Sequence, residues 1–281
     1  MTVSMPHIKL YEHWESTWAN VPKLAQFELG YKKEDVEWIS IELLKGGNFD
    51  PKFLKVNPNG TLPVLQVDGR NFVDSITSTR ELIRLAPLPC PASGTFDVGL
   101  IEKVHEVGNI QGLSIDEAEH KEKSSGLLGN FFAERQVALE NLIQMAPTEY
   151  QEFLTQKRAE NQQMFDFYCG SPDSTTREAH YNQCRSAWNA VGALIRGPIT
   201  DALKNTKGPF AAGEHPGEAD FHVATWLART ISNAGVSPNS PSSVAIPKLK
   251  ERTGGDSYDP CIAKYWDAWI VRPSFKESHV D

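Results

Sequence analysis

Two adjacent polar residues, Asp74 and Ser75, stand at the head of a segment with the pattern of a helix. A serine at a helix start offers a hydroxyl and free backbone N–H groups, and such groups bind carboxylates. The carboxylate of Asp74 adds a negative charge, which pairs with cations such as an ammonium group. The alternative is that either residue only caps the helix. The pair by itself favours a cap, and the surrounding residues shift the interpretation toward a binding site.

A second unusual residue is Pro63, at the head of the apolar run 62–67. A proline normally harms a strand, because it lacks the N–H that pairs with a neighbouring strand. A cis Leu62–Pro63 bond would account for its position, because it turns the backbone of Leu62 outward at the strand edge. A trans proline that starts an edge strand is the alternative. The residues alone leave both forms open, and the resemblance described below implies the cis bond.

The elements that must position these residues alternate between strands and helices up to residue 88. Alternating apolar and polar residues predict strands, while Pro22 and Gly30 predict the start and end of the first helix. Asp68-Gly69 is a strong signal for a two-residue hairpin. The predicted order is βαβ, then a hairpin, then a helix. The expected strands span 8–11, 36–41, 62–67 and 71–73, and the expected helices span 22–30 and 75–85.

Pro87, Pro89 and Pro91 interrupt the chain and predict a linker. Helical patterns dominate beyond it, and the polar, charged stretch 114–129 is expected to be an exposed excursion between helices. The sequence therefore predicts an α/β domain over 1–88 and an all-α domain over 98–281. The expected helices of the second domain span 98–111, 131–144, 150–168, 177–194, 219–234 and 262–271.

The run Asn57-Pro58-Asn59-Gly60-Thr61-Leu62-Pro63-Val64-Leu65, followed by the hairpin and Asp74-Ser75, resembles the glutathione transferase family. The segment 209–213 with Asp220, and the segment 272–275, resemble later parts of that family. The resemblance implies a thioredoxin-like α/β domain that binds glutathione. It also implies a following all-α domain that shapes a pocket for an apolar co-substrate. The resemblance also implies that Asp220 has a folding role at the start of a buried helix.

The resemblance assigns the two better-defined ends of glutathione to particular residues. The residue before the cis proline pairs its backbone with the cysteinyl part, which implies Leu62 with its neighbours Thr61 and Pro63. The acidic-Ser pair holds the γ-glutamyl end, which implies Asp74 and Ser75.

The glycine end of glutathione is less well matched. The aligned position is Asn48, while Phe49 stands where many relatives carry a lysine. Lys45 is the basic side chain that could compensate.

A hydroxyl near the start of the first helix is implied to activate the thiol, because the thiolate is the nucleophile and the helix dipole favours the anion. Alignment on Glu28-Leu29-Gly30 without a gap selects Ser16, as in phi-class enzymes, with Thr17 as the fallback. Alignment on Asn20-Val21-Pro22-Lys23 resembles fungal nitrogen-regulator-like transferases and selects Asn20. We favour Ser16, because it needs no gap and a hydroxyl is the better donor.

Other residues near this helix bear on the enzyme class. The segment holds no cysteine, which argues against classes that use one for reduction, and His13 is expected to be a surface residue. The combined patterns look most like the fungal-specific A class, which is related to β-etherase-type and phi-class enzymes. Trp14 and Trp18 beside Ser16 suggest an aromatic wall for a hydrophobic electrophile or aryl ether. A ligandin without turnover and an inactive regulatory homologue are the alternatives.

Composition narrows the partners. The formal net charge of -8 disfavours nucleic acid, and no run approaches the ~20 apolar residues of a membrane span. The four cysteines lie far apart and form no Cys-x-x-Cys pair, so we expect no metal and a cytoplasmic location. The N-terminus lacks the pattern of a secretory signal. The family resemblance further implies a homodimer.

Overall fold

The computed structural model describes residues 6–91, 95–108 and 114–278. The chain divides into two compact units. Unit 1 comprises Met1–Ser40, Leu62–Gln111 and Ala187–Asp281, and unit 2 comprises Ile41–Thr61 and Gly112–Ser186. These units do not follow the expected boundaries at residues 88 and 98, and the division into domains 1–88 and 98–281 stays a prediction.

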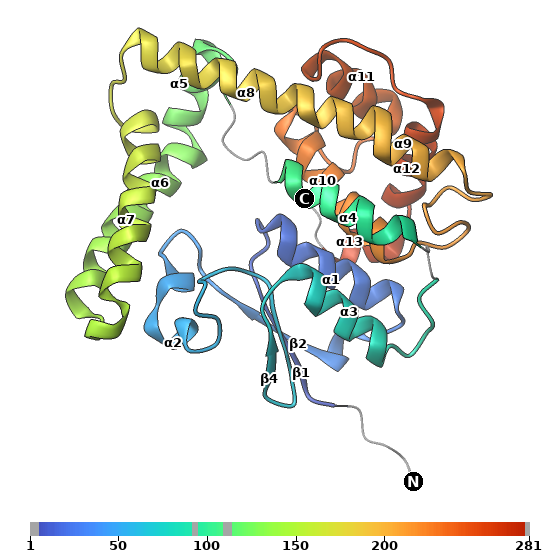
Figure 1. Cartoon of the computed structure of the whole chain (residues 1–281), viewed down its shortest axis with the longest axis horizontal. Helices are drawn as coiled ribbons and strands as arrows, with labels where there is room; N and C mark the ends of the chain where they lie inside the picture. Colours follow the sequence, from blue (N-terminus) through green and yellow to red (C-terminus); the bar gives the residue numbers. More distant parts are fainter. Residues whose placement is uncertain (1–5, 92–94, 109–113, 279–281) are drawn as a thin grey trace. The chain divides into compact units, whose positions relative to one another are not determined.

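A four-stranded mixed sheet lies in unit 1, with the strand order β2-β1-β3-β4. The strands are β1 (Ile8–Glu12), β2 (Val36–Ser40), β3 (Val64–Val67) and β4 (Arg70–Phe72). Strand β1 is parallel to β2 and antiparallel to β3, and β4 is antiparallel to β3. This arrangement confirms the predicted βαβ order followed by a hairpin. Helices α1 and α3 pack against each other and against strands of this sheet (Figure 1).

The register of the sheet brings three chain segments to the same end of the strands. Tyr11 near the end of β1 pairs with Val64 at the start of β3, and Leu65 pairs with Phe72 at the end of β4. The segments that leave β1, enter β3 and leave β4 therefore lie at the same end of the strands. The predicted site residues of unit 1 belong to these three segments.

The hairpin between β3 and β4 forms at Asp68-Gly69, as predicted. Asp68 has φ 48° and Gly69 has φ 86°. A two-residue turn with positive φ at both positions matches the right-handed twist of the flanking strands. Glycine adopts this backbone without strain, and aspartate tolerates it better than most residues.

The first helix starts earlier than predicted. Helix α1 spans Thr17–Glu28, with Pro22 inside it instead of at its start. Ser16 is the N-cap, and its side chain accepts a hydrogen bond from the Ala19 N–H. A cap that satisfies a free N–H begins the helix, whereas an internal proline removes one hydrogen bond. Burial of residues such as Leu24, which is 0% exposed, offsets that loss.

The remaining elements of unit 1 are mostly helical. The predicted helices over 75–85, 98–111, 219–234 and 262–271 correspond to α3, α4, α10 and α12, and helix α11 was not predicted. The bounds of these remaining elements are η1 (Lys33–Asp35), α3 (Ser75–Leu85), α4 (Thr95–Val107), the π-helix η3 (Ile195–Ile199), α9 (Thr200–Lys204), α10 (Glu218–Asn233), α11 (Ser242–Arg252), α12 (Pro260–Ile270) and α13 (Pro273–Glu277).

Unit 2 contains a pair of long helices that pack along each other, α6 and α7 (Figure 1). Its elements are η2 (Gly47–Phe49), α2 (Pro51–Leu54), α5 (Glu117–Ser125), α6 (Leu127–Met145), α7 (Thr148–Tyr168) and the part of α8 (Ser174–Leu194) up to residue 186. The predicted helices over 131–144, 150–168 and 177–194 correspond to α6, α7 and α8. Each begins before its predicted start.

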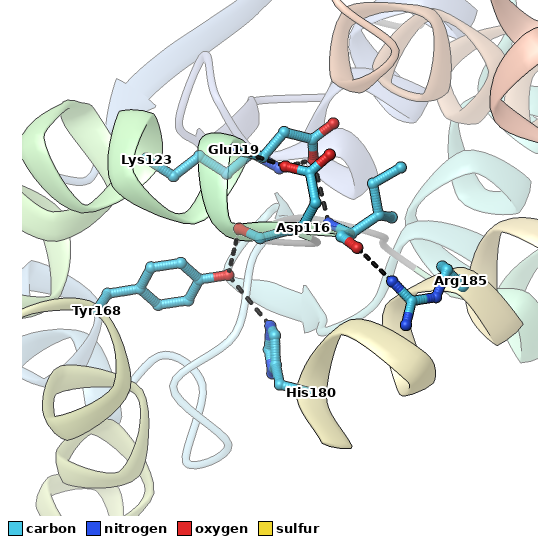
Figure 2. Close-up of polar contacts among 8 residues, drawn as sticks. Asp116, Glu119, Lys123, Tyr168, His180 and Arg185 are labelled. Atoms are coloured by element: carbon cyan, nitrogen blue, oxygen red, sulfur yellow. Dashed lines mark hydrogen bonds and ion pairs between the residues drawn. The ribbon is translucent and has the colours of Figure 1, made fainter. Parts of the chain in front are cut away.

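The stretch 114–129 keeps charged side chains such as Glu117 and Lys121 exposed, as expected, but it is helical and not an excursion between helices. It forms α5 and the start of α6, and His120 is only 8% exposed. The Tyr168 hydroxyl lies 3.2 Å from Ser114 Oγ and 3.3 Å from His180 Nε2, and the Arg185 guanidinium donates to the Ile115 carbonyl (Figure 2). These contacts with α7 and α8 hold the segment against the rest of unit 2.

Helix α10 forms the centre of unit 1 and packs against α1 and α4. Asp220 in its first turn is 0% exposed. Its carboxylate accepts hydrogen bonds from the N–H groups of Ala211, Ala212 and Gly217 at 2.8, 3.1 and 2.9 Å. The predicted folding role of Asp220 at the start of a buried helix is therefore confirmed.

Within the described ranges, no helix combines the length and the apolar character that crossing a membrane requires.

Candidate functional site

The start of α1 carries the hydroxyl that the sequence singled out. Ser16 is half-buried, and its Oγ lies 3.4 Å from the Ala19 nitrogen, a long hydrogen bond. The first N–H groups of a helix and its dipole attract negative charge. A hydroxyl in this position combines a donor with a favourable field for an anion.

The two rival side chains are more enclosed than Ser16. Thr17 and Asn20 are each 2% exposed. The Asn20 amide nitrogen donates to the Trp14 carbonyl at 3.1 Å, so this donor already has a partner within unit 1. Of these three side chains, Ser16 is the one with a partly accessible donor.

Two side chains hold the segment that precedes α1. Asn20 bonds the Trp14 carbonyl, and Arg229 on α10 donates to the Glu15 carbonyl at 2.7 Å. Consecutive carbonyls are thus tied to α1 and to α10 immediately before Ser16. The position of Ser16 therefore depends on helix α10, which lies more than 200 residues further along the chain.

The expectation for His13 was wrong. His13 is 3% exposed, and its Nε2 lies 3.6 Å from the Glu15 carboxylate. Its ring is enclosed because the chain turns from β1 into α1 at this point, with the Ser16 N–H bonded to the His13 carbonyl at 2.9 Å. A strand end that leads into a packed helix is not a surface position.

The predicted cis bond at Leu62–Pro63 is present. Among the described residues, the Leu62 N–H and carbonyl have no hydrogen-bond partner, and the Leu62 side chain is half-buried. Pro63 is buried and leads into β3. The backbone of Leu62 thus offers a free donor and a free acceptor at the end of the strands where β1 ends and β3 begins. A ligand with a peptide backbone can pair with two such groups.

The start of α3 presents two free N–H groups. Asp74 is the N-cap, and its Oδ1 accepts a hydrogen bond from the Thr77 N–H at 2.7 Å. Within the described chain, the N–H groups of Ser75 and Ile76 have no acceptor. Ser75 is 3% exposed, whereas Asp74 is exposed. Asp74 is therefore a cap, as the structural alternative held, and the N–H groups of Ser75 and Ile76 beside it stay free.

A pair of histidines that the sequence analysis did not single out lies against Ser75. His105 on α4 has its Nε2 3.5 Å from Ser75 Oγ and 3.0 Å from Nδ1 of His222 on α10. Burial lowers the pKa of His105, although Asp74 opposes the shift. Burial also lowers the pKa of His222 well below its usual value. No local pattern marks these histidines, because they belong to two separate predicted helices.

The two tryptophans beside Ser16 differ in exposure. Trp14 is 53% exposed. Trp18 is half-buried, and its ring stacks on His105 with 3.9 Å between the centroids and an interplanar angle of 16°. Trp14 therefore has a free face for an apolar ligand, and Trp18 supports His105.

The residues expected at the glycine end lie in unit 2 and are described there. The Asn48 amide donates to the Gly60 carbonyl at 2.6 Å, and Asn48 is 5% exposed. Gly60 has φ 62°, and a Cβ on it would lie 3.1 Å from the Asn48 carbonyl oxygen. Asn57 donates to the carbonyl of Thr61, which is exposed. The Asn48 side chain thus closes its own loop, and its ligand role stays a prediction.

In the parts of the chain that the structure describes, no group of three or more His, Cys, Asp or Glu side chains is arranged to hold a metal ion.

The first part of the chain is similar to known proteins. Residues 6–77 match the family described as glutathione S-transferase, N-terminal domain. Glutathione S-transferase Z1 of Arabidopsis thaliana is 47% identical over 62 residues, which cover 22% of this chain and 26% of that protein. The chain therefore matches about a quarter of the length of this curated relative.

Solved structures extend the likeness to the whole chain. The beta-etherase LigF from Sphingobium sp. strain SYK-6 has a TM-score of 0.53 at 16% identity, over 96% of this chain and 98% of that one. The glutathione transferase URE2P6 from Phanerochaete chrysosporium, in complex with oxidized glutathione, has a TM-score of 0.52 at 14% identity, over 97% and 94%. These likenesses confirm the predicted fold, a thioredoxin-like N-terminal domain with a helical C-terminal region.

Proposed function

We propose that this chain, whose residues 6–77 form a glutathione S-transferase N-terminal domain, is a glutathione transferase. The observation that supports the proposal most is a group of free backbone donors and acceptors at one end of the strands in unit 1. There a free Leu62 backbone before β3 and two free N–H groups at the start of α3 lie on segments joined by the strand register. These are the groups that a γ-glutamyl-cysteinyl ligand needs.

The binding half of the proposal divides glutathione between two segments. The Leu62 N–H and carbonyl pair with the cysteinyl backbone. The N–H groups of Ser75 and Ile76 bind the γ-glutamyl carboxylate, and the exposed Asp74 carboxylate faces the ammonium group. Thr61 and Pro63 flank the cysteinyl contact, and Asn48 remains the proposed contact of the glycine end.

The chemical half concerns the sulfur. Ser16 donates a hydrogen bond to the thiolate at the positive end of α1, which lowers the pKa of the bound thiol from its usual value of about 8.5. The thiol proton leaves to solvent. The thiolate then forms a carbon–sulfur bond with the co-substrate, whose leaving group departs with the bonding electron pair.

The co-substrate is proposed to be a hydrophobic, aromatic electrophile or aryl ether. The exposed ring of Trp14, two residues before Ser16, supports this choice. The likeness to a β-etherase fold is consistent with it, and so is a place in the fungal-specific A class with a role in detoxification. The four cysteines are free, which agrees with a cytoplasmic location. We also propose a homodimer, and light scattering that gives the 31.3 kDa protomer mass would contradict it.

The proposal is tested at the start of α3. Ser75→Ala removes a hydroxyl beside the free N–H groups, and it should weaken glutathione binding by ~1–2 kcal/mol. Retention on immobilised glutathione and calorimetric titration measure the change. Thr77→Ala is the matched control, because Thr77 is exposed on the same helical turn and contributes its backbone N–H to Asp74. Equal binding by wild type and Ser75→Ala would count heavily against the site.

A binding role without turnover is the second candidate, and one observation favours it. In unit 2, a groove of about 580 Å³ lies between Lys45 and the face of α6 that carries Val137 and Met145. Val137 is 58% and Met145 is 76% exposed, and both line the same groove, so they form an apolar surface that a ligand could cover. Turnover of a panel of aryl electrophiles and ethers separates the two functions, because a binding protein would retain the compounds unchanged.

A further inference from the structure

Arg135 on α6 is a half-buried cation of unit 2 to which the proposed chemistry gives no role. Its Nη1 donates a hydrogen bond to the Leu43 carbonyl at 2.8 Å. Its guanidinium carbon also lies 4.3 Å from the ring centroid of Phe49 and 5.2 Å from that of Phe131. Contacts of a guanidinium with aromatic rings are favourable, and more so when water is excluded. The hydrogen bond and the two rings therefore hold the guanidinium in one orientation.

The ring of Phe49 gives Arg135 a rigid support. Phe49 is 5% exposed and belongs to an apolar cluster with Leu139 of α6 and Leu154 of α7. Its ring also meets that of Phe153 edge to face, with 6.0 Å between the centroids and an interplanar angle of 71°. Phe49 cannot move without opening this cluster, so the guanidinium that rests on it is placed in advance of any ligand.

The guanidinium lacks a negative partner. Among the described residues, no carboxylate pairs with Arg135, and its Nε and Nη2 donors have no acceptor. Burial, with no acidic group to oppose it, lowers the pKa of Arg135 to about 10. Removing a cation from water is costly unless an anion joins it. An arginine that only held the Leu43 carbonyl would need a single donor, so the remaining donors indicate a place for an anion from outside the chain.

The donors on Nε and Nη2 form a planar fork that matches the two oxygens of a carboxylate. We propose that Arg135 binds a carboxylate of the ligand and that the glycine end of glutathione supplies it. The loop that carries Phe49 also carries Asn48, the proposed contact of that end. Asn48 is neutral and its amide already donates to the Gly60 carbonyl, so a carboxylate at this loop still requires a cation. The inference rests on the proposed glutathione site and adds the residue that recognises the charge of the glycine end.

Lys45 is the other cation of this loop, and it is less suited to the task. Its side chain is exposed, and among the described residues no hydrogen bond or ion pair fixes its ammonium group. A free lysine is strongly hydrated and loses conformational entropy when it is ordered on a ligand. Arg135 has already lost both its water and its freedom, so it should contribute more affinity than Lys45.

The test is calorimetric titration of the full chain with glutathione and with glutathione ethyl ester, in which the glycine carboxylate is esterified. Wild type should bind the ester about ten- to a hundredfold more weakly than glutathione, because the ester has lost its charged acceptor. Arg135→Met keeps an apolar chain against Phe49 and removes every donor. It should weaken glutathione binding by the same factor and should bind glutathione and the ester nearly equally. Arg135→Lys, which keeps the charge without the planar fork, should recover part of the affinity.

Two control variants make the same change of charge within unit 2. Arg158→Met should leave glutathione binding as in wild type, because Arg158 is 43% exposed and lies 3.9 Å from the Glu140 carboxylate. Lys45→Met should cause a smaller loss than Arg135→Met. A larger loss in Lys45→Met than in Arg135→Met would overturn the inference.

The two ligands separate recognition of the carboxylate from a general effect on folding. If Arg135→Met weakened binding of glutathione and of the ester by the same factor, Arg135 would act on the fold and the inference would be wrong. It would also be wrong if Arg135→Met bound glutathione normally and lost turnover only of aryl electrophiles that bear a carboxylate, since the co-substrate would then supply the anion. Wild type that binds neither glutathione nor the ester would instead remove the proposed function itself.

Discussion

Ser16 occupies the place in the molecule where local field and accessibility coincide. Its hydroxyl is half-buried at the N-terminus of α1, while Thr17 and Asn20 are each 2% exposed. The Asn20 amide and Arg229 hold the two preceding carbonyls. Its neighbours therefore hold Ser16 in position, while its hydroxyl hydrogen stays available to donate to a ligand.

The Ser16 hydroxyl should account for most of the activation of the thiol. Ser16→Ala should raise the pKa of bound glutathione and slow conjugation at neutral pH. The loss of one donor to a charged acceptor costs roughly 1.5–3 kcal/mol, which is about ten- to a hundredfold in rate. Ultraviolet titration of the bound thiolate measures the pKa directly, and glutathione should still bind.

Asn20→Ala is the matched comparison for the rival assignment. Its amide donates to the Trp14 carbonyl, so its loss should loosen the segment before α1 and have a smaller effect on the thiolate pKa than Ser16→Ala. Asn20 would be the activating residue if Asn20→Ala abolished thiolate formation and Ser16→Ala did not.

Among the elements, α10 contributes to the site although none of its residues was assigned to the ligand. Its first turn carries Asp220, its next residues include His222, and Arg229 reaches the segment before α1. Nearly every residue from Ala219 to Ile231 is buried. The helix therefore supports both the start of α1 and the histidines behind the start of α3, and its own start must be well satisfied.

Asp220→Ala should destabilise unit 1 by about 3–5 kcal/mol, because it removes a buried carboxylate and leaves the N–H groups of Ala211, Ala212 and Gly217 without an acceptor. Asp220→Asn, which retains one acceptor oxygen, should cost less. Urea denaturation followed by circular dichroism measures both.

Glu218→Ala is the control for this helix start. Glu218 pairs with Arg80, whose side chain is 47% exposed, so the loss should be below about 1 kcal/mol. If Asp220→Ala were no more destabilising than Glu218→Ala, the carboxylate would not hold the start of α10 as inferred.

At the scale of the whole molecule, each compact unit contains a pair of histidines whose pKa values are lowered chiefly by burial. His105 and His222 lie in unit 1, and His120 and His180 lie in unit 2. In the unfolded chain all four have the usual pKa of about 6.5 and accept protons more readily than in the folded chain. Acid therefore favours the unfolded form of both units.

The free energy of unfolding should be fully present above about pH 6.5 and should fall as the pH drops toward the lowered histidine pKa values of the folded state. The measurement is the midpoint of thermal unfolding at pH 7.5 and at pH 5.5, and a lower midpoint is expected at pH 5.5. His105→Phe should reduce this dependence.

A midpoint that stays constant or rises between pH 7.5 and pH 5.5 would contradict the account of the buried histidines.

The sequence by itself determined the features that depend on neighbouring residues. Asp68-Gly69 predicts its hairpin because two consecutive positive φ angles suit few residues, and Asp74 predicts the start of α3 because a cap needs only the next turn. The helical second half likewise followed from local patterns, whereas the cis Leu62–Pro63 bond was implied by the resemblance to a known family. Pro22 misled the prediction of the start of α1, because the Ser16 cap outweighs a proline that the helix tolerates.

Only the tertiary structure decided the features that depend on distant segments. His105 and His222 are 117 residues apart, and nothing near either one predicts that they meet behind Ser75. The charged segment 114–129 is helical and partly buried because Tyr168 and Arg185 bond to it from later helices (Figure 2). Burial and pairing are set by the packing of whole elements, and a local pattern carries no information about which segments will pack together.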